Sequence, residues 1–238
     1  MTSTPTFSLV IPCYNEAKGL PELIRRARFV ADEGGGEVIL VDNGSADESA
    51  AVLFGELGPE LVPGSVWWVK VEVNQGYGFG IRAGLASSRA DFIGWTHADL
   101  QTDPLDVLRA LDYLPDHPRG DLFVKGVRLG RPLADRVFTA GMSIFETLLL
   151  RRVLTDINAQ PTMFSRSLME RWGEAPSDFS LDVFALYAAR RLSFRVLRFP
   201  VIFADRKFGS SSWNTDFAAK WKFIKRTMDF SLEMKKRN

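Results

Sequence analysis

The stretch Phe92–Pro104, FIGWTHADLQTDP, changes from apolar to polar residues within a few positions. Its first four residues, FIGW, are mostly apolar and predict a short buried strand. His97, Asp99 and Gln101 then alternate along the chain, so in an extended backbone their side chains would point to the same side. A strand that ends in clustered polar side chains, with a proline where a helix can begin, is typical of the carboxyl edge of an α/β sheet.

The three alternating side chains are also of metal-ligand types. Carboxylate and amide oxygens with one imidazole can hold Mg²⁺ or Mn²⁺ against a diphosphate. The same letters equally fit a polar turn in which Asp and Thr side chains cap the next helix. From this segment alone, a metal site and a capped turn therefore both stay open.

Composition narrows the class of protein. The chain has 238 residues, is 46% hydrophobic and 25% charged, and fits one large domain or a domain with appendages. A net charge of +1 gives no argument for nucleic acid as a partner. The single cysteine, Cys13, excludes an internal disulfide, disfavours structural zinc and fits a reducing compartment. The sequence lacks the pattern of a signal peptide or a membrane-spanning helix, so we expect a cytoplasmic protein, soluble or peripheral on the membrane.

Strand and helix patterns alternate in the first half of the chain. The expected strands are Phe7–Ile11, Glu37–Val41, Val66–Val73 and Phe92–Trp95, and the expected helices are Ala17–Asp32, Ala46–Leu57 and Gly78–Ser88. Such alternation predicts a parallel sheet with right-handed crossovers. We therefore expect an α/β fold with a Rossmann-like, mostly parallel sheet flanked by helices.

After Pro118 the pattern is looser. The expected elements are strands at Leu122–Val127 and Phe194–Phe203 and helices at Asp135–Arg152, Leu181–Arg191 and Phe217–Asn238. Apolar residues of the Asp135–Arg152 helix recur at spacings of three and four, which makes it amphipathic. The last helix carries seven Lys and Arg against two acidic residues, a net charge of +5. We expect it to form a separate basic amphipathic segment, 213–238.

Polar clusters follow three of the expected strands, at Pro12–Glu16, Asp42–Asp47 and His97–Gln101. The carboxyl ends of parallel strands meet at one edge, so together the clusters predict a nucleotide-sized crevice. Singly, each is also a turn with a helix cap, for which Asp42 or Ser45 would serve. Between them, the glycines of Asn74–Gly80 would let backbone amides approach a phosphate, but the run lacks the G-x-G-x-x-G pattern of a dinucleotide enzyme.

Four segments in this order carry a family resemblance: FSLVIPCYNE (7–16), ILVDNGSADES (39–49), NQGYGFGIRAGL (74–85) and HADLQTDP (97–104). Together they resemble glycosyltransferase family 2 with the GT-A fold, and within it the dolichyl-phosphate mannosyltransferase-like branch. The resemblance implies an inverting transfer of a sugar from a nucleotide-diphosphate sugar to a polyprenyl phosphate, with a divalent cation. It also implies a nucleotide-binding half at 1–115 and an acceptor-binding half at 116–212.

The resemblance further implies roles for single residues. Those matched to nucleotide-sugar binding are Pro12, Tyr14, Glu16, Asp42, Asn43, Asn74, Gly76, Arg82 and Ala98. Those matched to the metal are His97, Asp99 and Gln101, of which His97 stands where the family has the first Asp of its DxD motif. This departure matters because imidazole can bind Mn²⁺ but suits Mg²⁺ poorly.

In the second half the resemblance matches Arg128, Arg136 and Ser210 to the acceptor and its phosphate, and Arg206 to the diphosphate. We count Asp99, Arg206 and Asp182 as the candidate catalytic residues. A phosphate acceptor is ionised near neutral pH and needs no strong base, whereas a hydroxyl acceptor would need one, and Asp182 is then the candidate. Asp182 equally fits a cap of the helix that follows it.

The expected partners are a nucleotide-diphosphate sugar, a polyprenyl phosphate and a membrane surface, with no nucleic acid. The helices Asp135–Arg152 and Phe217–Asn238 would supply the membrane contact, although core packing and contact with another copy or a membrane protein also fit them. Two other functions stay open: transfer to a hydroxyl of a glycan or small acceptor, and a non-catalytic member with a decayed metal site at His97. The sequence names neither the sugar nor the base of the nucleotide.

Overall fold

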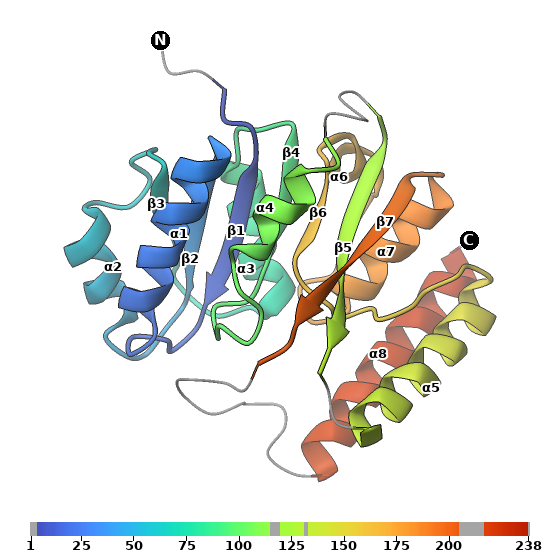
Figure 1. The fold of residues 1–238 in the computed structure, drawn as a ribbon. Coiled ribbons are helices and arrows are strands. Elements are labelled where there is room, and N and C mark those ends of the chain that lie inside the picture. Colours follow the sequence, from blue (N-terminus) through green and yellow to red (C-terminus); the bar gives the residue numbers. More distant parts are fainter. Residues whose placement is uncertain (1–3, 115–119, 131–132, 205–216, 238) are drawn as a thin grey trace.

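A seven-stranded sheet forms the centre of the protein (Figure 1). The structure is a computed structural model, and it describes residues 4–114, 120–130, 133–204 and 217–237. The strands are β1 Ser8–Cys13, β2 Glu37–Asn43, β3 Val66–Val71, β4 Phe92–Trp95, β5 Leu122–Leu129, β6 Thr162–Ser165 and β7 Arg195–Ile202. The helices are α1 Leu20–Gly34, α2 Ser49–Leu57, α3 Tyr77–Ser87, α4 Asp106–Leu111, α5 Leu133–Leu150, α6 Ser167–Arg171, α7 Leu181–Arg191 and α8 Phe217–Arg237.

The first half of the chain forms the parallel part of the sheet. β1 lies between β2 and β4 and pairs with both in parallel, and β2 pairs in parallel with β3. The helix α1 ends at Gly34, two residues after the expected Asp32. The next residue, Gly35, has a φ of 62°, a left-handed conformation that glycine adopts without strain. The predicted alternation of strands and helices is confirmed in this half.

The second half joins the same sheet through one reversed strand. β6 pairs antiparallel with both β4 and β5, and β5 then pairs in parallel with β7, which gives the order β3-β2-β1-β4-β6-β5-β7. Gly94 allows β6 to approach β4, because a Cβ at that position would lie 2.0 Å from the carbonyl oxygen of Thr162. The sheet is therefore continuous through both halves, and it remains mostly parallel.

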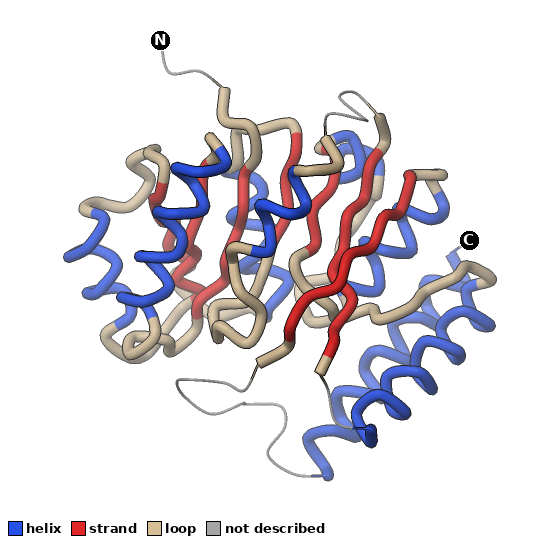
Figure 2. Tube along the Cα trace, in the orientation of Figure 1, coloured by secondary structure: helices blue, strands red, loops and turns tan. Residues whose placement is uncertain are grey.

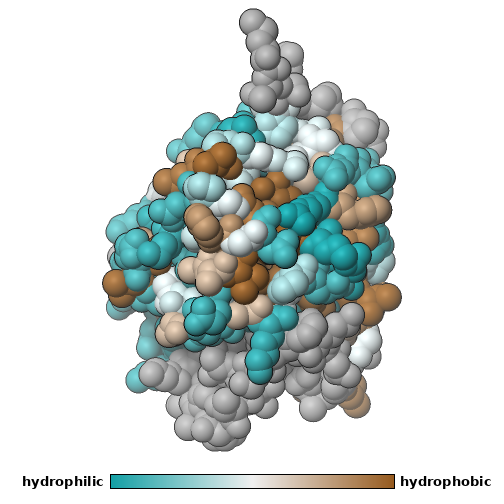
Figure 3. Space-filling model, turned by 90° about the vertical axis from the view of Figure 1, so that its left-hand side faces the viewer, coloured by the Kyte–Doolittle hydropathy of each residue, from teal (hydrophilic) through white to brown (hydrophobic). Residues whose placement is uncertain are grey.

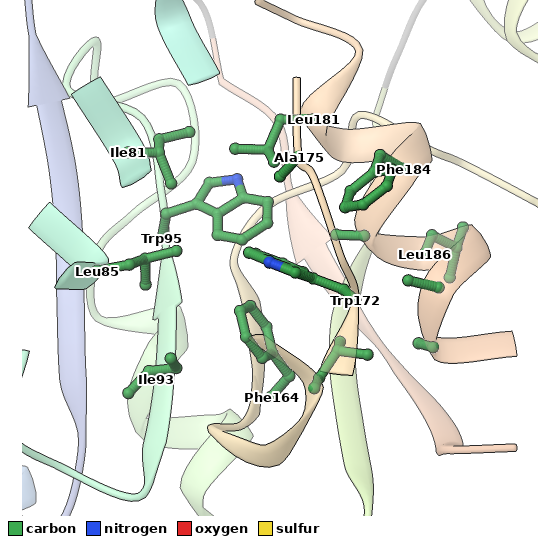
Figure 4. Close-up of a cluster of buried hydrophobic side chains, with 14 of the residues drawn as sticks. Ile81, Leu85, Ile93, Trp95, Phe164, Trp172, Ala175, Leu181, Phe184 and Leu186 are labelled. Carbon is green, nitrogen blue, oxygen red and sulfur yellow. The ribbon is translucent and has the colours of Figure 1, made fainter. Parts of the chain in front are cut away.

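Helices cover both faces of the sheet (Figure 2). The core under α1, α2 and α4 contains Leu23, Leu53 and Val107, all fully buried. On the other face, under α3, α6 and α7, Trp95 packs edge-on against Phe164, and Trp172 packs beside Phe164 (Figure 4). Most of the packing on both faces is thus apolar.

The helices α5 and α8 lie side by side, away from the parallel part of the sheet (Figure 1). The Phe230 ring of α8 packs against Phe184 of α7, so this pair of helices contacts the body of the fold. Both helices were predicted, with ends that differ by one or two residues from the expected ones. None of the helices in the described ranges is both long and apolar enough to cross a bilayer.

Candidate nucleotide-sugar site

The first two polar clusters interlock at the carboxyl ends of β1 and β2. The backbone amides of Asn15 and Glu16 donate hydrogen bonds to the hydroxyls of Ser45 and Ser49, each at 3.1 Å. In return, the Asn15 Oδ1 atom accepts a hydrogen bond of 2.8 Å from the amide of Ala46. The predicted meeting of these clusters at one edge of the sheet is confirmed.

Asp42 lies inside this interlocked edge, with a relative exposure of 1%. Its Oδ1 atom accepts a hydrogen bond of 3.0 Å from the amide of Ser45, which closes the turn after β2. The alternative in which Asp42 or Ser45 caps the next helix is wrong, because α2 begins only at Ser49 and Asp47 accepts that residue's amide. Around this turn, Tyr14 is 47% exposed and Glu16 is 9% exposed, and Pro12 pairs with Val41 in the sheet.

The turn before α3 is held against the second cluster. The Asn43 Nδ2 atom donates to the carbonyl of Gly76 at 3.0 Å, and Asn74 Oδ1 accepts from the amide of Gly76 at 2.8 Å. Gly76 has a φ of 111°, and a Cβ there would lie 2.5 Å from the carbonyl oxygen of Ser177. Glycine is therefore required both by the backbone conformation and by the close approach. The exposed Arg82 donates from Nη1 to the carbonyl of Ala175 at 2.9 Å.

The third cluster lies at the end of β4, beside the turn before α3. The His97 Nε2 atom is 2.9 Å from the Tyr77 hydroxyl, and the two rings meet edge to face at 5.5 Å. Asp99 Oδ1 accepts a hydrogen bond of 3.1 Å from the amide of Gln101, and Ala98 between these polar residues is buried. Leu100 has a φ of 57°, so the backbone bends here. The expected extended alternation of His97, Asp99 and Gln101 is wrong, because the segment forms a turn.

Gln101 also contacts the chain just after β7. Its carbonyl accepts a hydrogen bond of 2.8 Å from the amide of Ala204, and its Nε2 atom donates to the Ala204 carbonyl at 3.2 Å. Ala204 is the last described residue before 205–216, so the predicted Arg206 and Ser210 lie outside the described residues.

The donor atoms of the third cluster suit a cation that is shared with a diphosphate. Within the described ranges, no group of three His, Cys, Asp or Glu side chains comes together as a protein-only cage. Mg²⁺ bound to substrate phosphates takes one or two carboxylates from the protein and completes its shell with phosphate oxygens and water. Asp99, with Gln101 and His97 beside it, fits that kind of shared site.

Asp182 lies at the start of α7 but does not cap it. The helix has Ser180 at its N-cap and no side-chain capping bond, so the capping alternative is wrong. The Asp182 carboxylate is 2% exposed and accepts hydrogen bonds from Gln160 Nε2 at 2.9 Å and Lys125 Nζ at 3.3 Å. Asp182 is thus the centre of a buried polar group.

The sequence analysis missed Lys125, Gln160 and Tyr77 as members of this centre. Burial lowers the pKa of the Lys125 ammonium to about 8, although Asp182 opposes that shift. The pKa of the Tyr77 hydroxyl is raised by burial first, and then by the charges of Asp182 and Asp99. The signal for Lys125 was its place in the apolar strand LFVKGV, where a lysine has to be buried or to reach an edge.

Of the residues expected to bind the acceptor, only Arg128 has a described side chain. Its guanidinium donates to Asp156 Oδ1 from Nε at 2.8 Å, and its backbone amide donates to Asp156 Oδ2 at 2.8 Å. The charge of Arg128 is therefore paired within the protein, 10% exposed, and holds β5 to the loop after α5. Arg136 belongs to α5, where its side chain is outside the described set.

Comparisons with known proteins agree with these features. A family model described as "Glycosyl transferase family 2" matches residues 8–171. Undecaprenyl-phosphate 4-deoxy-4-formamido-L-arabinose transferases from Sodalis glossinidius and Klebsiella pneumoniae are each 30% identical, over 216 and 213 residues. These matches cover 87% of this chain and 62% of each relative, so the chain spans less than two thirds of their length.

Two solved structures have the same fold at low identity. A mannosyltransferase from Pyrobaculum calidifontis, in complex with GDP-Man and Mn²⁺, superposes with a TM-score of 0.66 at 20% identity, over 100% of this chain and 66% of that one. A glucosyl-3-phosphoglycerate synthase from Mycobacterium tuberculosis, in complex with Mn²⁺, UDP and phosphoglyceric acid, gives 0.72 at 19% identity, over 97% and 78%. The GT-A fold expected from the sequence is thereby confirmed.

Proposed function

The chain belongs to glycosyl transferase family 2, and from this premise we propose that it transfers a sugar from a nucleotide-diphosphate sugar to a polyprenyl phosphate. The observation that carries the donor half of the proposal is the interlocking of the polar clusters after β1 and β2, with the third cluster at the end of β4. The acceptor half is supported by relatives named as undecaprenyl-phosphate transferases.

In this proposal the nucleoside lies over the interlocked edge, against Tyr14, Glu16 and Asp42. The turn before α3 closes over the nucleoside, and hydrogen bonds of Asn43 and Asn74 to Gly76 hold that turn. Arg82 of α3 holds the helix after this turn to the carbonyl of Ala175. Asp99, with Gln101 and His97, would hold a divalent cation at the diphosphate. Such a cation supplies positive charge to the departing diphosphate. Positioning and charge stabilisation then provide most of the catalysis.

Replacing Asp42 by alanine should weaken the binding of UDP or GDP by about tenfold or more, because a buried carboxylate that bonds a nucleoside hydroxyl contributes roughly 1.5–3 kcal/mol. The fold should persist, since Asp42 closes one turn only. Calorimetric titration with each nucleotide measures the effect, and circular dichroism checks the fold. Asp32→Ala is a matched control, because Asp32 is an exposed carboxylate at the end of α1. Unchanged affinity in Asp42→Ala would place the nucleoside elsewhere.

The acceptor chemistry follows from the charge of a phosphate. A phosphate monoester is already ionised near neutral pH, so it attacks the sugar without a strong base. We propose that Arg206 and Ser210 bind phosphate oxygens, since Gln101 holds Ala204, two residues before Arg206, beside the third cluster. For a hydroxyl acceptor, Asp182 would be the base, but its carboxylate is buried and already accepts bonds from Lys125 and Gln160.

A lipid acceptor requires a surface of the protein that contacts the membrane, and α5 exposes an apolar stripe that suits such contact. Its residues Leu133, Val137, Ile144 and Leu148 recur at helical spacing and are 72%, 64%, 61% and 73% exposed. The adjacent α8 belongs to the segment Phe217–Asn238, whose net charge is +5. An apolar stripe beside a basic helix suits the surface of an anionic bilayer, so we propose peripheral membrane contact through α5 and α8.

The membrane contact and the acceptor are tested together. We expect the protein to sediment with anionic liposomes, and Leu148→Asp to weaken that binding several-fold, because it puts a charge into the apolar stripe. Val62→Asp is the matched control, because Val62 is 56% exposed in the loop between α2 and β3. The face of the molecule shown in Figure 3 carries apolar patches among hydrophilic side chains. Transfer from Mn²⁺-nucleotide sugar to a short polyprenyl phosphate should be detectable by chromatography. A protein that ignores liposomes and glycosylates a soluble hydroxyl instead would contradict the proposal.

A further inference from the structure

The loop of residues 175–179 packs against the start of α3, directly after the turn that contains Asn74 and Gly76. The amide of Phe79 donates to the Ser177 carbonyl at 2.9 Å, and Arg82 donates to the Ala175 carbonyl at 2.9 Å. A Cβ on Gly78 would lie 2.7 Å from the carbonyl oxygens of Pro176 and Asp178. The 175–179 loop therefore touches α3 backbone to backbone, and a shift of one requires a shift of the other.

Aromatic packing continues from this loop to the third cluster, His97–Gln101. The Phe179 ring stacks on Tyr77, with ring centroids 4.6 Å apart and an interplanar angle of 10°. The Tyr77 hydroxyl meets His97 Nε2 at 2.9 Å. A hydrogen bond to one ring nitrogen of a histidine fixes the orientation of the ring. In the tautomer in which Nε2 carries the proton and donates it to Tyr77, Nδ1 would be the nitrogen available to a cation.

The other side of the 175–179 loop contacts α8 through one arginine. Arg226 Nε lies 3.1 Å from Asp178 Oδ2, and its guanidinium carbon lies 5.5 Å from the centre of the Phe179 ring. The two side chains of the ion pair are 41% and 32% exposed, so the pair alone contributes little to stability. The ion pair matters more for the position of the 175–179 loop than for stability, because this loop touches both α3 and Tyr77.

We propose that Arg226 of α8 is a positioning residue for the donor site: by holding Asp178 and Phe179 it sets Tyr77, and through Tyr77 it sets the His97 ring that faces the cation and diphosphate. The inference rests on the proposed function, which places the donor diphosphate at this cluster. It adds a role for α8, which begins at Phe217, beyond the family match that ends at residue 171. A ligand or surface that moves α8 then changes donor affinity, and donor binding changes the affinity of α8 for that ligand by the same factor.

The test measures Mn²⁺-dependent binding of UDP and of GDP, by calorimetric titration, in the full chain. Arg226→Ala should weaken binding of the nucleotide that the wild type binds by about three- to tenfold, a coupling of about 1 kcal/mol. Lys225→Ala is the matched control, because it removes the same charge from the neighbouring exposed position of α8. Arg226→Lys keeps the cation beside Asp178 and should restore most of the affinity.

A double-mutant cycle separates positioning from general damage to the fold. In a His97→Ala background, Arg226→Ala should weaken nucleotide binding no further, because the residue through which it acts is gone. Tyr77→Phe keeps the stacking on Phe179 but removes the hydroxyl, and should weaken Mn²⁺-dependent binding as Arg226→Ala does. Equal losses from Arg226→Ala with and without His97, or a lower melting temperature with unchanged nucleotide affinity, would overturn the inference. A wild type that binds neither nucleotide would instead overturn the proposed function, and this inference with it.

Discussion

Asp99→Asn should reduce Mn²⁺-dependent binding of the nucleotide diphosphate, and sugar transfer with it, by at least about 100-fold. The substitution removes the negative charge of the only carboxylate that the third cluster offers to a shared cation, and charge stabilisation of this kind is worth several kcal/mol in a transition state. Asparagine keeps an oxygen that can accept the Gln101 amide, so the turn after β4 should persist. Calorimetry with and without Mn²⁺, and a transfer assay, measure the two losses.

Asp103→Asn is the control for Asp99→Asn. Asp103 lies four residues further on, where it accepts the amide of Leu105 at 3.0 Å and pairs with Arg26. Its loss removes the same charge nearby and should leave Mn²⁺ dependence unchanged. His97→Asp should in turn shift the metal preference from Mn²⁺ toward Mg²⁺, because a carboxylate replaces an imidazole. If Asp99→Asn binds nucleotide with full Mn²⁺ dependence, the cation is held elsewhere.

The parallel half of the fold could be predicted from the sequence because its signals are local. Apolar runs such as FSLVI and VILV are long enough to identify buried strands, and Gly34–Gly36 marks the end of a helix. The polar clusters could be predicted to meet for a topological reason, since the carboxyl ends of parallel strands share one edge. The contacts of Asn15 with Ser45 and Ala46 follow from that rule.

What could not be predicted depends on contacts between distant residues. β6 has four residues, TMFS, and is defined by its pairing with β4 and β5 rather than by any pattern of its own. The bend at Leu100 comes from a left-handed backbone that its sequence does not signal. Likewise, the pairing of Arg128 with Asp156 and of Asp182 with Lys125 joins residues 28 and 57 positions apart. Local patterns therefore predicted which strand ends meet but not the contacts that support them.

Removing one partner of the pair Lys125–Asp182 should cost more stability than removing one partner of an exposed ion pair. Both side chains are buried, at 0% and 3% exposure. Lys125→Met removes the cation and leaves the Asp182 carboxylate in the core, where Gln160 Nε2 still donates to it. Removing one partner of a buried pair typically costs about 3–5 kcal/mol, because the other charge stays uncompensated. Urea unfolding near neutral pH measures the loss. The control Lys70→Met breaks an exposed pair with Glu72 and should change stability little, because water and salt screen such a pair.

The stability difference between the wild type and Lys125→Met should also depend on pH in a defined direction. Burial lowers the pKa of Lys125 in the folded protein to about 8 from its usual 10.5. Between these values the unfolded chain binds the proton and the folded chain releases it, so the wild type gains stability as pH rises through this window. The gain approaches about 3 kcal/mol for a shift of this size, and it is lost as pH falls through the folded-state pKa. Lys125→Met lacks this group, so the wild type should exceed it by more at about pH 9.5 than at about pH 7. A difference that stays flat across this window would mean that Lys125 keeps an ordinary pKa, and that water reaches it in the folded protein.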